Sequence, residues 1–200
     1  PGTFHYKADC RGAIGTASSI RINLRTSHLR LCQVVVYGAA PECPTGIAAE
    51  TFWEDIEIGR VLETGSMKME ATDIRSFAKK FDPQTYHFDR EAGEASLFDG
   101  LCASGSHVAA VMMKLVSDQL AREEIPLIGR GQVSWLEWYR PAFEGDHLSA
   151  HMTITDRSRS ENKTDHGLIE CDIAVHNQKQ KKVMALSTEL MIESKRPEDD

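Results

Sequence analysis

The stretch from Phe81 to His107 holds the side chains that are best suited to acid–base chemistry. Asp82 stands five residues before His87, so one short segment supplies a carboxylate and an imidazole. A turn containing glycine then leads into a helical pattern that begins near Ser104. The first N–H groups of a helix have no intrahelical partner and can stabilise a developing negative charge. An acid–base pair beside a helix start is therefore suited to chemistry on a carbonyl compound.

A short helix is predicted immediately before Asp82. Its apolar residues, which recur at helical spacing, are Ile74, Phe77, Ala78 and Phe81. Thr72 or Asp73 is the expected N-cap. Pro83 ends the helix, because proline lacks an N–H and disfavours helix at the residue before it. We therefore expect Asp82 and His87 to lie in a loop just beyond a helix end, where functional groups are often found.

The longest helical pattern covers residues 104–120 and follows a second short helix expected over residues 89–96. Its apolar stripe consists of Val108, Val111, Met112, Leu115, Val116 and Leu120, and is widened by Ala109, Ala110 and Met113. A helix that is apolar over most of its circumference is usually buried. We expect this helix to form the centre of the core.

Strand patterns precede and follow the long helix. They cover residues 61–70, 131–139, 147–155, 168–176 and 183–192. The last three alternate apolar and polar residues, which is typical of an antiparallel sheet with one face in water, and a polar hairpin loop is expected over 157–165. The predicted fold class is α+β: a hot dog fold, in which an antiparallel sheet wraps around one long buried helix. Such a sheet has an exposed edge, which dimerisation normally covers.

Composition limits the class of partner. The hydrophobic fraction of 41% in 200 residues is ordinary for a globular protein. The formal net charge of −7 argues against a surface for nucleic acid or for an anionic membrane. No apolar stretch approaches the roughly 18 to 20 residues of a membrane span. We therefore expect no nucleic-acid or membrane partner, while a local basic patch for a phosphorylated ligand stays open as an alternative.

The cysteines indicate a reducing compartment. Positions 10, 32, 43, 102 and 171 carry them, an odd number without a C-x-x-C spacing. This pattern predicts a cytoplasmic protein with neither a disulfide framework nor a zinc cage. No metal site and no bound cofactor are expected.

Residues 1–50 differ from the rest of the chain, because arginine and lysine are common there and acidic residues are few. We interpret them as a weakly ordered extension with one candidate strand over 31–37. An integral part of the fold and an organelle targeting peptide are the alternatives. The domain itself is predicted over residues 51–193, followed by a charged tail over 194–200.

Three features together resemble the MaoC-like dehydratases, the R-specific enoyl-CoA hydratases. They are the spacing of Asp82 and His87, the small-residue turn over 101–105, and the later Tyr-Arg-Pro-Ala-Phe-Glu-Gly-Asp segment over 139–146. The resemblance covers about residues 52–192. It implies that Asp82 and His87 hold and activate a water, and that the backbone N–H of Gly105 binds the thioester oxygen.

This chain departs from the family pattern at two points. The Asn-Pro pair of the family's Asp-x-Asn-Pro-x-His loop is replaced by Gln84-Thr85, with a proline displaced to position 83. The His-Gly pair often seen at the helix start is Ser104-Gly105, which keeps the glycine needed for an oxyanion site. The first change is expected to alter loop shape or substrate preference.

Further candidates for substrate binding are Ser104, Cys102, Trp135, Arg130 and Arg140. Each has a structural alternative: Ser104 as a helix N-cap, Cys102 as a small buried residue and Trp135, with Trp138, as core or pocket wall. The arginines are either surface charges or contacts to the phosphates of a CoA-type substrate. His107, one turn into an apolar helix, is interpreted as a core or interface residue. Asp82 and His87 have alternatives as a turn residue and as a loop histidine bonded to backbone.

The leading functional hypothesis is a homodimeric hydro-lyase that adds or removes water across the α,β double bond of an acyl-CoA or acyl-carrier-protein thioester. The same oxyanion site would serve an acyl-CoA thioesterase, because fold does not fix function. A non-catalytic acyl-binding protein is the third hypothesis, and the change at Gln84-Thr85 motivates it.

Overall fold

The computed structural model describes residues 51–159 and 165–195. The predicted extension over 1–50, its candidate strand over 31–37 and tail residues 196–200 lie outside this part of the chain. The elements are η1 (Trp53–Asp55), β1 (Val61–Lys68), α1 (Ala71–Phe81), α2 (Thr85–Phe88), α3 (Arg90–Glu94), α4 (Gly105–Arg122), β2 (Leu127–Trp138), β3 (His147–Arg159), β4 (His166–His176) and β5 (Lys182–Glu193).

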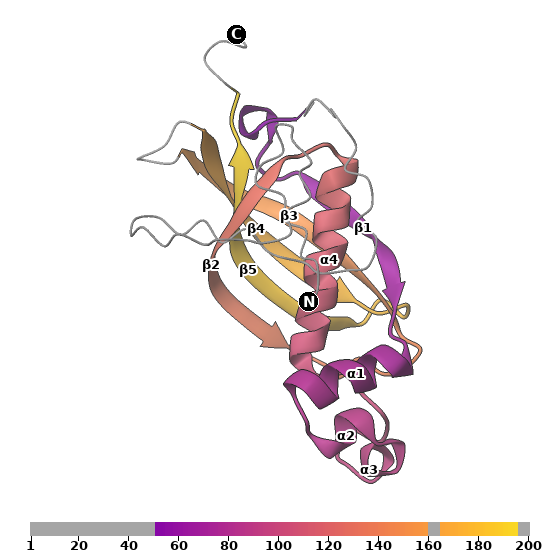
Figure 1. Ribbon diagram of the computed structural model, residues 1–200. Helices are drawn as coiled ribbons and strands as arrows, with labels where there is room; N and C mark the ends of the chain where they lie inside the picture. Colours follow the sequence, from indigo (N-terminus) through magenta and orange to yellow (C-terminus); the bar gives the residue numbers. More distant parts are fainter. Residues whose placement is uncertain (1–50, 160–164, 196–200) are drawn as a thin grey trace, which may run out of the picture. The chain divides into compact units, whose positions relative to one another are not determined.

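The described strands form one antiparallel sheet in the order β1-β3-β4-β5-β2, which curves around α4 (Figure 1). The predicted apolar stripe of α4 is buried along its whole length, and it packs against the inner face of the sheet. The predicted hot dog fold is therefore confirmed. Removal of this apolar surface from water is the main force that holds the helix in the sheet.

The inner residues of β3 and β4 alternate as predicted. The buried set is Leu148, Ala150, Met152 and Ile154 on β3, with Ile169, Cys171, Ile173 and Val175 on β4. The start of β5 differs, since Val183 and Ala185 are buried as well as Met184 and Leu186. The carbonyl of Val183 accepts from the backbone N–H groups of Tyr139 and Arg140, so the segment after β2 is tied to this strand.

Several boundaries differ from the sequence prediction. Helix α1 begins at Ala71, with Glu70 as an N-cap that makes no side-chain cap bond, so neither Thr72 nor Asp73 is the cap. Strand β2 begins earlier than predicted, and β3 continues to Arg159 into the expected hairpin loop. Both strands are longer than predicted because their additional residues pair with the backbone of a neighbouring strand. Polar side chains do not prevent this pairing.

The helices α1, α2 and α3 lie together beyond one end of the sheet, next to the N-terminus of α4 (Figure 1). The chain after α3 returns tightly against it: Gly100 N–H donates to Gly93 O at 3.1 Å. A Cβ on Gly93 would lie 2.7 Å from Gly100 O, so this approach requires glycine. The return leads directly into Leu101 and the start of α4.

The last described residues contact the segments at the end of the sheet near η1. Ser194, placed in the predicted tail, is buried, and its N–H donates to Asp165 O at 3.1 Å. Lys195 Nζ lies 2.8 Å from Asp55 Oδ1. None of the helices in the described part of the chain is long and apolar enough to cross a membrane.

Candidate active site

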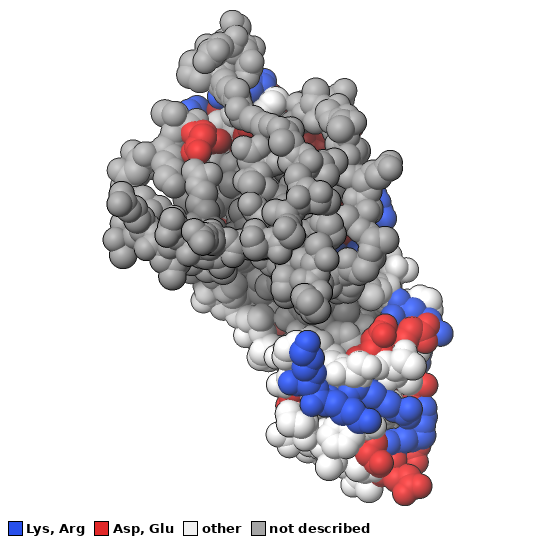
Figure 2. Space-filling view, viewed as in Figure 1, with Lys and Arg blue, Asp and Glu red and all other residues white. Residues whose placement is uncertain are grey.

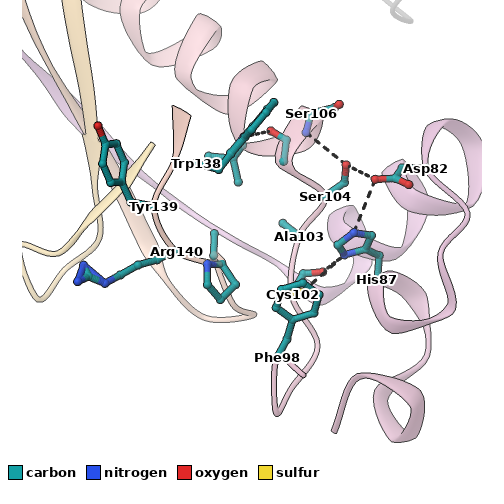
Figure 3. A pocket seen from close by; sticks show the side chains of 14 residues that line it. Asp82, His87, Phe98, Cys102, Ala103, Ser104, Ser106, Trp138, Tyr139 and Arg140 are labelled. Atoms are coloured by element: carbon teal, nitrogen blue, oxygen red, sulfur yellow. Dashed lines mark hydrogen bonds and ion pairs between the residues drawn. The ribbon is translucent and has the colours of Figure 1, made fainter. Parts of the chain in front are cut away.

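Asp82 is fixed at the C-terminus of α1. Its N–H donates to Ala78 O at 2.9 Å, and Pro83 follows, so the chain turns away from the helix at this residue. Its side chain points toward the start of α4 (Figure 3), where Oδ2 accepts the hydroxyl proton of Ser104 at 2.7 Å. The carboxylate is therefore held from two elements that are far apart in sequence.

His87 lies in the single-turn helix α2 and not in a loop as predicted. Its side chain is buried, with 7% of the residue exposed, and it packs beside the rings of Tyr86 and Phe98. Nδ1 lies 2.8 Å from Cys102 O. A carbonyl oxygen can only accept, so Nδ1 carries the proton and donates it. In the neutral ring, Nε2 is then the unprotonated nitrogen.

The carboxylate of Asp82 and the imidazole of His87 converge. Asp82 Oδ2 lies 3.6 Å from His87 Nε2, beyond the range of about 2.7–3.2 Å for a direct hydrogen bond between them. Both atoms are acceptors when the ring is neutral, so neither can satisfy the other. A water molecule has two protons and can donate one to each. The pair is thus arranged to hold a water between a carboxylate and a potential base.

The N-terminus of α4 borders the same space. Ser104 is the N-cap, as one of its two interpretations predicted, and its Oγ accepts from Ser106 N–H at 3.3 Å. The N–H of Gly105 is among the first of the helix, where no preceding carbonyl is available. The partial positive charge of an 18-residue helix reinforces these N–H groups.

Trp138 at the end of β2 covers Gly105. Its Nε1–H donates to Gly105 O at 3.1 Å, and a Cβ on residue 105 would lie 2.8 Å from the indole ring. A side chain at position 105 would therefore displace the Trp138 ring from its contact with the first turn of α4.

These groups line one pocket of about 500 Å³, which is within the usual range of small-molecule sites. Asp82 and His87 form one side and Tyr139 and Arg140 the other (Figure 3). The wall between them is largely apolar and comes from Phe98, Ala103, Val108, Trp138, Pro141 and Ala142. The pocket therefore combines an acid–base pair with an apolar surface.

Cys102 contributes mainly through its backbone. Its side chain is buried, and burial raises the pKa of its thiol, which disfavours a nucleophilic thiolate. Its carbonyl fixes the tautomer and orientation of His87. No side-chain pattern could have revealed this contact, because any residue at position 102 has a carbonyl.

Two predicted binding residues do not line this pocket. Arg130 Nη2 donates to Ser117 Oγ at 2.8 Å and to Met113 O at 3.4 Å, so it joins β2 to α4. Trp135 lies on the edge strand β2, where its side chain remains exposed. Ser104, Cys102 and Arg140 do line it.

His107 is a buried residue, as expected, but it is not fully satisfied. Its ring stacks on Phe77 at 4.7 Å between centroids, and its buried Nδ1 has no hydrogen-bond partner in the described part of the chain. Asp89 caps α3 by accepting Ala92 N–H at 2.8 Å. Within residues 51–159 and 165–195, no three His, Cys, Asp or Glu side chains are grouped to hold a metal ion.

Comparison with known proteins identifies the family of the chain. Residues 55–173 match the model of the MaoC-like domain family. The chain belongs to this family. A MaoC-like dehydratase from Rhodospirillum rubrum has a similar structure, with 32% identity, a TM-score of 0.63 and coverage of 73% of this chain and 99% of that one.

Two further proteins are similar at lower sequence identity. The uncharacterized protein YdeM of Bacillus subtilis (strain 168) is 29% identical over 131 residues, which are 65% of this chain and 90% of the relative. The R-hydratase PhaJ1 from Pseudomonas aeruginosa shares the fold at 19% identity and a TM-score of 0.55, over 72% of this chain and 86% of that one.

Proposed function

We propose that this MaoC-like protein catalyses the reversible addition of water across the α,β double bond of an acyl thioester. One observation carries the proposal: Asp82 Oδ2 and His87 Nε2 lie 3.6 Å apart in a pocket that also borders the N-terminus of α4. The family's dehydratase members support this reaction class.

The thioester oxygen is assigned to the N–H of Gly105. Attack on the β-carbon moves charge onto this oxygen, which becomes enolate-like in the transition state. A preorganised N–H donor at that point contributes roughly 10²–10³ in rate. The absence of a side chain on Gly105 allows the oxygen to approach this N–H closely.

The water is assigned to the space between Asp82 and His87. As its oxygen attacks the β-carbon, one of its protons passes to the acid–base pair, with His87 Nε2 as the acceptor. The pair then returns one proton to the α-carbon, and Asp82 relays it. Neither residue changes its protonation state over a full cycle, and dehydration is the same sequence in reverse.

The test is hydration of enoyl-CoA esters by purified protein, followed by the loss of ultraviolet absorbance of the conjugated thioester. Asp82→Asn or His87→Ala should lower kcat by about 10²–10⁴, the usual value of positioned acid–base catalysis. Asp118→Asn and His147→Ala are the matched controls, since neither residue is buried and neither lines the pocket. Asp82→Asn and the two controls should unfold near the wild-type temperature, whereas His87→Ala also loses buried ring contacts, so its thermal unfolding is measured beside its activity.

The same assay separates the alternatives. Unchanged turnover in both Asp82→Asn and His87→Ala would rule out the proposed mechanism. Release of free thiol from a saturated acyl-CoA would instead favour a thioesterase. Binding of acyl-CoA without turnover across a broad panel would favour a non-catalytic acyl-binding protein.

We also propose that the protein acts as a homodimer that pairs through β2. This strand is one edge of the sheet, and it and the turn after it carry several exposed apolar residues: Ile128, Val133, Trp135, Trp138 and Tyr139. An exposed apolar edge favours pairing with another chain. A second copy would cover the strand close to the pocket wall that Trp138 forms.

A further inference from the structure

The wall of the pocket opposite the acid–base pair carries a cation. Arg140 follows β2 and lines the pocket together with Tyr139 and Pro141. Its guanidinium points away from Asp82 and His87 (Figure 3), and the residue is exposed. A group bound by Arg140 would therefore belong to a part of the substrate that lies away from the reacting carbons.

Lys182 supplies a second cation beside Arg140. Arg140 Nη1 donates to Lys182 O at 3.4 Å, and Lys182 Nζ lies 5.2 Å from the centre of the Tyr139 ring. Lys181 and Lys179 are exposed in the adjoining turn between β4 and β5. This end of the sheet thus gathers positive charge in a chain whose formal net charge is −7.

These cations are not neutralised by ion pairs. Among the described residues, neither Arg140 nor Lys182 has a carboxylate within 4.0 Å. Nearby acids are engaged elsewhere: Glu144 pairs with Arg90, and Asp146 accepts from Phe143 N–H and Gln178. Glu137 accepts from the hydroxyl of Tyr139, which raises the pKa of Tyr139.

We propose that Arg140 and Lys182 form a subsite for the phosphate of the thioester carrier, the phosphopantetheine phosphate common to coenzyme A and to acyl carrier proteins. This inference rests on the proposed function. An acyl chain is apolar and fits the buried wall of Ala103, Val108 and Ala142, so the exposed cations face the opposite, carrier end of the thioester. A guanidinium binds phosphate oxygens as a hydrogen-bonding fork, and an ammonium on a neighbouring residue adds a positive point charge.

The experiment compares three crotonyl thioesters, of coenzyme A, of phosphopantetheine and of N-acetylcysteamine, which lacks phosphate. Arg140→Gln and Lys182→Gln should each raise KM for the two phosphorylated substrates about fivefold, the upper range for an exposed ion pair. The change in kcat should be small, because neither residue contacts the reacting carbons. KM for the N-acetylcysteamine thioester should not change.

Lys80→Gln is the matched control. Figure 2 shows Lys and Arg side chains beside Asp and Glu side chains over the part of the molecule that carries α1 to α3, so this region also presents cations. Lys80 lies on α1, with Nζ 5.0 Å from the Phe81 ring centre, a contact like that of Lys182 with Tyr139. Its ring contact is with Phe81, which does not line the pocket, whereas Lys182 contacts Tyr139 and Arg140, which do. Loss of Lys80 should therefore leave KM for each thioester unchanged.

The outcomes separate this inference from the proposed function. Absence of hydration by the wild-type protein would contradict the proposed function. Hydration with the same KM in Arg140→Gln, or an equal rise in Lys80→Gln, would overturn the phosphate subsite alone. An effect with crotonyl-CoA and crotonyl-phosphopantetheine supports the shared phosphate, whereas an effect confined to crotonyl-CoA assigns the contact to the nucleotide phosphates and overturns the proposal as stated.

Discussion

The chemistry of the candidate site depends on groups that hold the reactive pair in position. Ser104 Oγ–H donates a hydrogen bond to Asp82, and the carbonyl of Cys102 accepts one from His87 Nδ1–H. Each reactive side chain is thereby oriented by the turn that begins α4. Asp82 and His87 could be chosen from sequence because their types and spacing suit acid–base chemistry. Their anchors could not, because a serine before a helix first suggests a cap and a carbonyl has no sequence signal.

At Gly105 we expect an alanine to be harmful, although alanine is the better helix former. Its Cβ would lie 2.8 Å from the indole of Trp138. Gly105→Ala should lower the free energy of unfolding by about 1–3 kcal/mol, as overpacking does, and should lower kcat by displacing the pocket wall. Denaturant unfolding and hydration assays measure both effects.

Replacement of Trp138 by alanine tests whether the clash with its ring causes the loss of stability in Gly105→Ala. In a Trp138→Ala background the added methyl group has space, so Gly105→Ala should cost little stability there. Equal costs in the two backgrounds would show that the clash with Trp138 is not responsible.

His107 makes stability depend on pH. Burial lowers the pKa of His107, and the nearby charge of Asp73 only partly opposes this. The unfolded chain, with a histidine pKa near 6.5, then binds more protons than the folded one below that pH. The contribution of His107 to the free energy of unfolding should therefore be fully present above about pH 6.5. It should be lost as the pH falls toward the lowered pKa of the folded state.

Denaturant unfolding between neutral and mildly acidic pH checks this, with His107→Phe as the variant, since phenylalanine keeps a ring against Phe77. In this variant the free energy of unfolding should depend less steeply on pH than in the wild-type protein. A remainder is expected from His176, whose pKa burial also lowers. An NMR titration of the wild-type ring that gave an ordinary or raised pKa for His107 would contradict the prediction.

Among the elements, those with a long hydrophobic period were predicted well. Helix α4 and the strands β3, β4 and β5 repeat their pattern over many residues, so burial of one face fixes both their type and their orientation. Met113 is the exception among the large apolar residues of α4, because it is 45% exposed. The apolar side chain of Met113 does not indicate which face of the helix the sheet leaves uncovered.

Short elements were predicted less well. Helix α2 has four residues, too few to display a period, and it forms because tertiary contacts hold it. Pro83 correctly marks the end of α1, since its effect is local. The start of α1 has no side-chain cap, so capping preference pointed to the wrong residue. Local chemistry thus locates breaks in the chain more reliably than it identifies the elements between them.

At the scale of the whole molecule, the sheet has two edges that differ in character. Strand β2 and the turn after it expose several large apolar side chains, whereas β1 at the other edge exposes Val61 alone among its large apolar residues. A lysine on an edge strand hinders pairing, because its charge would have to be buried against the neighbour. The location of a dimer interface can therefore be tested by placing the same charge on each edge in turn.

We expect Val133→Lys on β2 to convert the protein from a dimer to a monomer. The matched change Val61→Lys on β1 should leave the dimer intact, since Val133 is 50% and Val61 52% exposed in the single chain. Light scattering after size-exclusion chromatography measures the mass directly. Because β2 leads into Trp138 and the pocket wall, the Val133→Lys monomer should also hydrate enoyl-CoA less efficiently. A monomeric wild-type protein, or dissociation by Val61→Lys and not by Val133→Lys, would place the interface elsewhere or remove it.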